Sequence, residues 1–382
     1  MRIGFDAKRA FHNFRGLGNY SRTLLDGLSK YFPDNEYILF TPSFKDERAI
    51  AFMRTHAALK VVGPEGLLKT VPSLWRSVLL ANELKNRDLD IYHGLSHELP
   101  PFFHARTKCV VTMHDLIFLR YPEFFPWIDR KIYLRKFTHA VTRADIVLAI
   151  CEQTKNDLIE LLKAPAQKIV VAYQSCDPLF YTGHSALENK EVVQRYGIQK
   201  DFILSVGALE ARKNQLGLIE AYKSLEEDLD LVFVGKGKDY KKLMQEKLRE
   251  YGLEARAHFL ENLPLQELPH FYQSAALMAY PSFFEGFGLP IVEALFSGCP
   301  VVTSEGSCFP EAGGPKTIYV NPKKPEDLAQ AMHRVLRTPE LRQEMIQAGR
   351  DYVQRFHQAK TTQHLMGLYR EISTRPGATS LL

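Results

Sequence analysis

Short apolar runs alternate with longer helical patterns along almost the whole of this 382-residue chain. Alternation of this kind predicts parallel β-sheets whose two faces are both covered by helices. The runs form two series, separated by a stretch without strand patterns. The expected strands are 2–5, 36–40, 60–62, 91–92, 108–113, 146–149 and 169–172 in the first series, and 202–206, 231–234, 257–259, 277–280, 300–303 and 317–320 in the second.

The two series predict an α/β protein with two doubly wound, Rossmann-like domains, since the chain is too long for one ordinary core. We expect a first domain over 1–178, a linker over 179–200 and a second domain over 201–354. A further helix is expected at about 355–375, and the sequence leaves open whether it packs back on the first domain. Such domains bind ligands beyond the carboxyl ends of their strands, so we expect the site in a deep cleft between them.

Composition narrows the class of protein. The five cysteines are widely spaced and form no CxxC pair, which favours reduced thiols in the cytosol over a disulfide framework or a zinc site. No apolar run approaches the ~18–20 residues that a spanning helix needs, and the first residues do not resemble a signal segment. We therefore expect a cytoplasmic protein, which could still contact the inner face of a membrane.

The segment 280–298, YPSFFEGFGLPIVEALFSG, is the most informative in the chain. A strand pattern ends, a turn with Gly288 follows, and Pro290 suits the first turn of a helix. A glycine turn at a helix N-terminus can bring backbone N–H groups close to a phosphate. Glu285 and Glu293 flank this turn, and we expect them to accept hydrogen bonds from sugar or ribose hydroxyls. The alternative is a helix cap with two solvated carboxylates.

A second candidate lies in SVGALEARKN, residues 205–214. Gly207 turns the chain at the end of a strand, and Arg212 and Lys213 precede the next helix. Two cations beside a helix N-terminus suit a diphosphate, and we expect both side chains to be exposed in the cleft. The alternative is an ordinary solvated pair, which is the usual state of lysine and arginine.

Five residues of the first series are weaker candidates. Gly16 and Gly18, in FRGLGNYSRTLL, precede a helix pattern and predict either a loop that approaches a ligand closely or a plain turn. His114 follows a strand directly, so it is either a site residue or a packed histidine. His93 and His97, in YHGLSHELP, are expected to line an acceptor pocket; their spacing outside a helix argues against a metal pair.

EGFGLPIVE resembles the E-x7-E signature of retaining glycosyltransferases of family 4, which have the GT-B fold. The resemblance extends along nearly the whole chain. It covers GLGNYSRTLL, VTMHDLIF, ADIVLAICEQTKNDL, SVGALEARKNQ, LVFVGKGKDY and PVVTSEGSCFPE. Several motifs in the same order make chance agreement improbable.

The resemblance implies a role for each matched residue. Glu293 would bind the ribose hydroxyls and Glu285 the hydroxyls of the transferred sugar, while Arg212 and Lys213 would bind the pyrophosphate. His114 resembles the histidine that lies near the far hydroxyls of the sugar. The other donor-binding positions implied are Gly16, Gly18, Gly207, Gly235, Lys236, Leu263, Phe287, Gly288 and Leu289.

The resemblance also implies an activity. We expect transfer of a hexose from a nucleoside-diphosphate sugar to a glycan or lipid-diphosphate-linked acceptor, with retention of configuration and GDP-mannose as the first donor to test. No metal and no cofactor is expected, because Arg212 and Lys213 would supply the countercharge and no DxD motif is visible. The alternatives are another GT-B enzyme, of the epimerase or phosphorylase type, and a non-catalytic nucleotide-sugar-binding protein. Loss of the charged site residues would mark the last of these.

The two halves of the chain differ in net charge. Residues 1–178 contain 25 basic and 19 acidic residues, whereas residues 179–382 contain 24 and 25. Part of the excess lies in FFPWIDRKIYLRKFTHAVTR, where basic residues interleave with aromatic ones. This pattern indicates either a solvated helix face or peripheral contact with anionic lipid, and nucleic acid is the weakest option. The residues concerned are Arg130, Lys131, Arg135 and Lys136.

Overall fold

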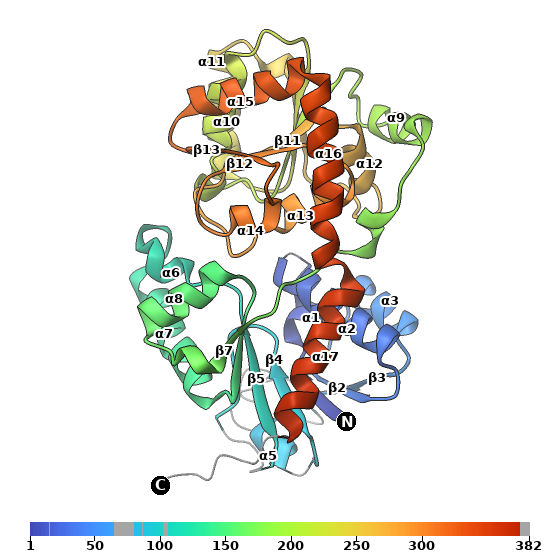
Figure 1. Ribbon diagram of the computed structural model, residues 1–382, viewed down its shortest axis with the longest axis vertical. Helices are drawn as coiled ribbons and strands as arrows, with labels where there is room; N and C mark the ends of the chain where they lie inside the picture. The colour runs from blue at the N-terminus through green and yellow to red at the C-terminus, as the bar shows by residue number, and fades with distance from the viewer. Residues whose placement is uncertain (15, 65–79, 86, 102–105, 375–382) are drawn as a thin grey trace. The chain divides into compact units, whose positions relative to one another are not determined.

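The computed structural model of this chain describes residues 1–14, 16–64, 80–85, 87–101 and 106–374. Contacts divide the chain into two units, Met1–Ser175 with Phe356–Leu382, and Cys176–Arg355. Each unit is built around one parallel sheet with helices on both faces (Figure 1). The prediction of two doubly wound α/β domains is confirmed.

The sheet of the first unit has seven strands in the order β3-β2-β1-β4-β5-β6-β7, all parallel. Neighbouring residues of a strand enter opposite faces, because side chains alternate across a sheet. Ile38 and Phe40 of β2 join one buried cluster, and Tyr37 and Leu39 join the other. The strands are β1 (Arg2–Asp6), β2 (Glu36–Phe40), β3 (Leu59–Val62), β4 (Ile91–Gly94), β5 (Lys108–Met113), β6 (Ile146–Ala149) and β7 (Ile169–Val171).

The helices of the first unit include one from the end of the chain. This last helix, α17, packs on α2. The sequence pattern also predicts a helix over 73–86, of which residues 73–79 and 86 lie outside the described residues. The helices are α1 (Lys8–His12), α2 (Gly16–Tyr31), α3 (Glu47–Thr55), α5 (Leu80–Lys85), α6 (Ile117–Arg120), η3 (Pro122–Phe124), α7 (Trp127–Arg143), α8 (Glu152–Leu162), η4 (Ala166–Lys168) and α17 (Gln358–Thr374).

The sheet of the second unit has six parallel strands in the order β10-β9-β8-β11-β12-β13. Its strands are β8 (Phe202–Val206), β9 (Asp230–Val234), β10 (Ala257–Leu260), β11 (Leu277–Tyr280), β12 (Val301–Ser304) and β13 (Ile318–Val320). Its helices are η5 (Pro178–Tyr181), α9 (Ala186–Gln194), η6 (Ala211–Lys213), α10 (Gln215–Lys223), α11 (Asp239–Glu250), η7 (Glu254–Arg256), α12 (Leu268–Ser274), α13 (Leu289–Phe296), α14 (Phe309–Gly313), α15 (Pro325–Arg337) and α16 (Pro339–Val353); η8 (Gln354–Phe356) joins α16 to α17.

Strand order reverses once in each sheet. In the second unit the chain leaves β8 toward β10 on one side and from β11 toward β13 on the other, so the reversal lies between β8 and β11. In the first unit it lies between β1 and β4. Loops that follow the strands at such a point diverge and leave room for a ligand. The topology of the second sheet therefore predicts a ligand site at the loops after β8 and β11.

The segment 179–200, expected as a linker, is part of the second unit. The boundary falls at Ser175 and not at residue 178, and the segment contains η5 and α9. Helix α9 begins with a capping box in which Ser185 and Glu188 exchange hydrogen bonds. Its Asn189 accepts a hydrogen bond from His270 of α12 at 2.8 Å. The absence of a strand pattern here does not mark a linker, because the short helices η5 and α9 occupy most of the segment.

Candidate active site

The loops that follow β8 and β11 are joined directly. The N–H of Phe283 in the β11 loop donates to the carbonyl of Arg212 in the β8 loop at 2.9 Å. Arg212 also donates from Nη1 to the carbonyl of Phe284 at 2.6 Å. These bonds bring together two sequence segments about 70 residues apart and hold them at the reversal point of the sheet.

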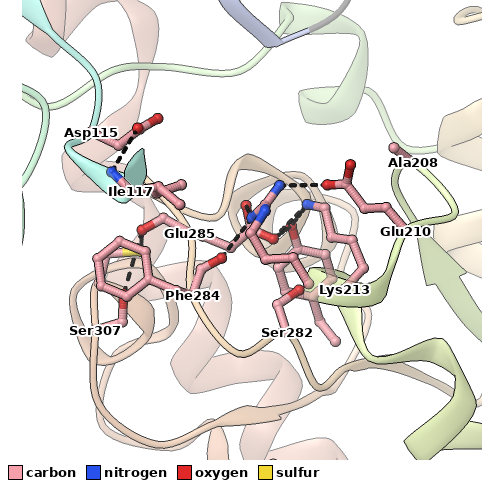
Figure 2. Close-up of polar contacts among 12 residues, drawn as sticks. Asp115, Ile117, Ala208, Glu210, Lys213, Ser282, Phe284, Glu285 and Ser307 are labelled. Carbon is pink, nitrogen blue, oxygen red and sulfur yellow. Dashed lines mark hydrogen bonds and ion pairs between the residues drawn. The ribbon is translucent and has the colours of Figure 1, made fainter. Parts of the chain in front are cut away.

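An ion cluster lies where the loops meet. Arg212 Nη1 lies 2.8 Å from Glu285 Oε2, and Lys213 Nζ lies 2.5 Å from Glu285 Oε1. Arg212 Nη2 lies 2.6 Å from Oε1 of Glu210. Tyr280, the last residue of β11, accepts from Lys213 at 2.6 Å and donates to Glu285 at 2.9 Å. We call these five residues the ion cluster; Figure 2 shows the Lys213 side chain directed at Glu285.

The prediction that Arg212 and Lys213 are exposed is wrong. Their side chains are 18% and 10% exposed, because each is paired with Glu285, which is itself buried. Burial alone would raise the pKa of Glu285, but the charges of Lys213 and Arg212 outweigh it and lower that pKa to about 2. The Glu285 carboxylate therefore stays ionised at neutral pH. With Arg212 and Lys213 it forms a triad whose net charge is one positive unit, which Glu210 balances in the five-residue ion cluster. An anion that displaces Glu210 from Arg212 would meet a net positive surrounding.

The backbone of Glu285 is fixed as well as its side chain. Its carbonyl accepts a hydrogen bond from the Ser307 hydroxyl at 3.4 Å, visible in Figure 2, and one from the Cys308 thiol at 3.3 Å. Both donors follow β12, the next strand of the sheet. Three consecutive strand ends therefore position this residue.

Helix α13 begins directly after the glycine turn. Gly288 has φ +94°, a left-handed conformation in which a side chain would be strained, and Pro290 stands in the first turn. Phe287 is buried and Leu289 is the first helical residue. This arrangement directs the N-terminal end of a helix, which favours negative charge, toward the same edge of the sheet as the ion cluster.

Glu293 is separate from the ion cluster. It lies in α13 and accepts a hydrogen bond from the Tyr272 hydroxyl at 2.9 Å, and in the described part of the chain no cation forms an ion pair with it. Burial, with a smaller contribution from nearby Asp177, raises the pKa of Glu293 to about 7. At neutral pH this carboxyl can therefore donate as well as accept hydrogen bonds, as a partner of hydroxyl groups should.

The remaining predicted donor positions lie at the ends of β8, β9 and β10. A Cβ on Gly235, whose φ is +155°, would lie 1.8 Å from the carbonyl oxygen of Gly207, so the two strand ends approach too closely for any side chain. Lys236 is exposed and Leu263 is half-buried in the loop after β10. These four residues therefore share the sheet edge of the ion cluster, and their contact with a nucleotide base stays a prediction.

Three predicted histidines cluster in the first unit. His114 is buried, and its Nε2 donates to the carbonyl of Leu95 at 2.9 Å, which leaves Nδ1 as the unprotonated nitrogen. The ring of His97 stacks on Phe137 with a centroid separation of 4.4 Å. Burial lowers the pKa of His114 to about 4 and also lowers the pKa of His97. Both rings are therefore neutral at physiological pH.

His93 does not line a pocket. It lies inside β4, is completely buried, and both ring nitrogens are used within the protein. Nδ1 lies 2.6 Å from the Tyr369 hydroxyl of α17, and Nε2 lies 2.8 Å from Oγ1 of Thr112. The strand continues two residues further than expected, so this histidine holds the last helix against the sheet and presents no ring atom to an acceptor.

Gly16 and Gly18 lie in the first turn of α2 and not in a loop before it. A Cβ on Gly18 would lie 1.6 Å from the carbonyl oxygen of Asn13, whereas one on Gly16 would meet nothing within 4 Å. Gly18 therefore permits the tight connection between α1 and α2. This structural reason accounts for one of the two glycines.

Several residues around the site were not predicted. Tyr280 and Tyr272 hold the two glutamates through side-chain hydroxyls, and Glu210 shares Arg212 with Glu285. Ser282, in the β11 loop, is completely buried, and its hydroxyl has no hydrogen-bond partner in the described residues. Tyr280 lies five residues before Glu285 and Glu210 two residues before Arg212, so their proximity to the motifs was a signal. Tyr272 lies 21 residues before Glu293, in another helix, and nothing in the sequence pattern pointed to it.

Within the residues that the structure describes, no group of three or more His, Cys, Asp or Glu side chains could hold a metal ion. No helix in that part of the chain is both long and apolar enough to cross a bilayer. All five cysteines are buried free thiols.

Comparison with known proteins agrees with this architecture. Residues 14–178 match the family described as Glycosyltransferase Family 4, and residues 188–352 match the family described as Glycosyl transferases group 1. The O-antigen chain mannosyltransferase B of Escherichia coli is 28% identical over 347 residues, covering 84% of this chain and 87% of the relative. The O-antigen chain mannosyltransferase RfbU of Salmonella typhimurium is 26% identical over 271 residues, covering 71% of each chain.

Solved structures share the fold. Anabaena Alr3699/HepE, crystallised in complex with UDP and glucose, has a TM-score of 0.77 at 19% identity and covers 97% of this chain and 100% of its own. WaaG, a glycosyltransferase involved in lipopolysaccharide biosynthesis, has a TM-score of 0.73 at 17% identity, covering 97% and 99%. The fold and the two family matches define a glycosyltransferase with the GT-B fold. Within that class, the chain is of the family 4 type.

Proposed function

We propose that this chain transfers a hexose, with mannose the sugar to test first, from a nucleoside-diphosphate sugar to a glycan or lipid-diphosphate-linked acceptor, with retention of configuration. The observation that carries the proposal is the ion cluster at the reversal point of the second sheet, where Arg212 and Lys213 are paired with Glu285, four residues before α13 begins. Buried, fixed positive charge is what a departing diphosphate requires.

The chemistry follows from where charge develops. The bond between the anomeric carbon and the diphosphate oxygen breaks, so that negative charge grows on the leaving group and positive charge on the sugar ring. Arg212, Lys213 and the helix N-terminus stabilise the leaving group, and removal of one such donor typically costs about 10²–10³ in rate. For retention we propose attack from the same face, with the acceptor's hydroxyl proton passing to the leaving phosphate oxygen as the new bond forms.

The carboxylates suit binding better than nucleophilic attack. A glycosidase places two carboxyl groups on either side of the bond that it breaks, whereas here Glu285 is ion-paired and Glu293 bonds to Tyr272. We propose that Glu293 binds the ribose hydroxyls and that Glu285 orients the sugar while holding both cations in place. His114 is proposed to contact the sugar through its unprotonated Nδ1.

Support for the identity of the donor sugar and base comes from the similar proteins alone. The two relatives described above are named mannosyltransferases of O-antigen chains, which favours mannose and polysaccharide assembly. HepE was crystallised with UDP, which keeps uridine in the comparison with guanosine. The named relatives are transferases and lend no support to an epimerase or to a non-catalytic protein, and the charged residues whose loss would mark the latter are present.

Thermal shift against GDP-, UDP-, ADP- and dTDP-sugars tests the donor, followed by hydrolysis of the best ligand without an acceptor. We expect GDP-mannose to give the largest shift and slow release of mannose as the α-anomer in hydrolysis. A matched control is GDP alone, which shares the diphosphate but offers no sugar to transfer. A shift equal for all four sugars, with no hydrolysis of any, would contradict the proposed activity.

A further inference from the structure

The first two turns of helix α7 are exposed on a face where large apolar side chains and cations alternate. The side chains of Trp127, Ile128, Ile132 and Leu134 are 59%, 55%, 46% and 40% exposed. Phe124, just before the helix, is 38% exposed. Of the nine large hydrophobic residues found exposed among the described residues, six fall between positions 124 and 134, including Tyr133. Scattered exposed hydrophobics are ordinary, but a cluster of this kind marks an interaction surface.

Helical spacing places the two residue types on one face. Trp127, Lys131 and Leu134 follow one another at intervals of four and three residues and therefore form a row along the helix. Ile128, Ile132 and Arg135 form the neighbouring row by the same spacing. We call these six residues the α7 face. Helix α7 packs on the rest of the first unit through Phe137, Ala140 and Val141, which are the buried residues of the second half of the helix. It lies beside α6 (Figure 1).

The cations of the α7 face are available to a partner. The helix has five basic residues and one acidic residue, Asp129. Lys136 is engaged by Glu98 at 2.9 Å, but within the described part of the chain neither Lys131 nor Arg135 forms an ion pair with a carboxylate. The ammonium group of Lys131 lies over the Trp127 ring, 4.6 Å from its centroid, so that aliphatic stem, aromatic ring and charge form one continuous surface.

We infer that the α7 face docks on an anionic lipid bilayer. The apolar side chains would enter the boundary between headgroups and acyl chains, where tryptophan is favoured. Lys131 and Arg135 would keep their stems in that layer and extend their charges to the lipid phosphates. The charge complementarity separates this partner from an apolar protein groove, in which two unpaired cations would be buried at a cost. This docking goes beyond the proposed transfer activity and does not depend on it.

Flotation of the full chain with vesicles tests this surface. The vesicles contain phosphatidylcholine alone, or phosphatidylcholine with about one third phosphatidylglycerol to provide the negative surface that basic residues recognise. We expect binding to the anionic vesicles only, weakened by added salt because part of the attraction is screened. One variant carries Trp127→Ser and Ile128→Ser, and a second carries Lys131→Gln and Arg135→Gln. A third, Lys242→Gln with Leu243→Ser, removes an exposed lysine and an exposed leucine from α11 of the second unit as a matched control.

The Lys131→Gln/Arg135→Gln variant should bind anionic vesicles at least about tenfold more weakly, since each charge near the surface contributes roughly fivefold. The Trp127→Ser/Ile128→Ser variant should also lose at least about tenfold, because two large apolar side chains no longer enter the bilayer interface. The α11 control should bind like the wild type. All three should keep the wild-type melting temperature, because the replaced side chains are exposed. Absence of wild-type flotation, or equal flotation of all variants, would overturn the inference. Concentration-dependent dimerisation that only the α7 variants abolish would assign the face to a second copy of this chain and would overturn it too.

Discussion

Glu210 is the most exposed member of the ion cluster, with a side chain that is 44% exposed, and it competes for Arg212. A diphosphate entering this site would meet a carboxylate already bound to the cation that it needs. Glu210→Gln keeps the shape and removes the charge, so we expect free nucleoside diphosphate to bind about 1.4- to fivefold more tightly, which corresponds to the ~0.2–1 kcal/mol typical of an exposed pair. Titration calorimetry measures this change, and Glu226→Gln is a control, because Glu226 lies in the connection after helix α10 and pairs with Arg337. Weaker binding in Glu210→Gln would show that this carboxylate contacts the ligand itself.

Lys213 has a structural role in addition to its proposed contact with the diphosphate. Lys213→Met leaves the buried Glu285 carboxylate with Arg212 as its remaining cation, and breaking a buried pair in this way typically costs about 3–5 kcal/mol. We therefore expect a lower free energy of unfolding together with loss of transfer. In the double variant Lys213→Met/Glu285→Gln the buried carboxylate that lost one of its two cations is gone, so stability should return while activity does not. Chemical denaturation of the two variants separates these effects; an unrecovered double variant would contradict the pairing.

At the scale of elements, the α1–α2 connection distinguishes two glycines that look alike in sequence. Gly18→Ala would place a Cβ 1.6 Å from the carbonyl oxygen of Asn13, whereas Gly16→Ala meets open space. We expect the first substitution to destabilise the first unit by several kcal/mol, in the range of strained or overpacked sites. The second should change stability by less than about 1 kcal/mol. Thermal unfolding of both variants checks this, and equal melting temperatures would refute the steric explanation for Gly18.

Strand positions were largely readable from the sequence, because buried parallel strands form short continuous apolar runs. The strands β2, β5, β6, β8 and β11 begin and end where they were expected. Short helices were not readable: α1, α3, α6, α9 and α14 have between 4 and 9 residues, too few for a helical period to stand out. The motifs located Arg212, Lys213 and Glu285 individually. Their mutual pairing depends on contacts between distant loops, which no local pattern encodes, and so their burial was missed.

At the scale of the whole molecule, titratable groups with shifted pKa values are divided unequally between the units. Burial lowers the pKa of His93 to about 3 and that of His114 to about 4 in the first unit. In the second unit burial raises the pKa of Glu293 to about 7. The unfolded chain binds protons at these histidines below about pH 6.5 and at the glutamate below about pH 4.3. The two units therefore differ in which state, folded or unfolded, takes up protons first.

Lowering the pH from 7 to 5 should therefore change the stability of the two units in opposite directions. In the first unit the unfolded state binds more protons at His93 and His114, so their contribution to stability is complete above pH 6.5 and falls toward the folded pKa values, by about 2 kcal/mol per buried histidine at pH 5. The hydrogen bond to Asp26 raises the pKa of His56, which opposes part of this loss. In the second unit the folded state binds the extra proton at Glu293, which raises stability as pH falls toward 5, and the lowered pKa of His270, caused by burial, opposes part of this gain. The low pKa of Glu285 opposes this gain only below about pH 4.5.

Calorimetry should show the first unit melting at a lower temperature, and the second unit at a higher temperature, at pH 5 than at pH 7. Tryptophan emission identifies the earlier transition, because both tryptophans of the chain fall within residues 1–175 of the first unit. His93→Gln should reduce the acid sensitivity of the first transition, and Glu293→Gln should flatten the pH dependence of the second; parallel shifts of both transitions in the wild type would contradict this division.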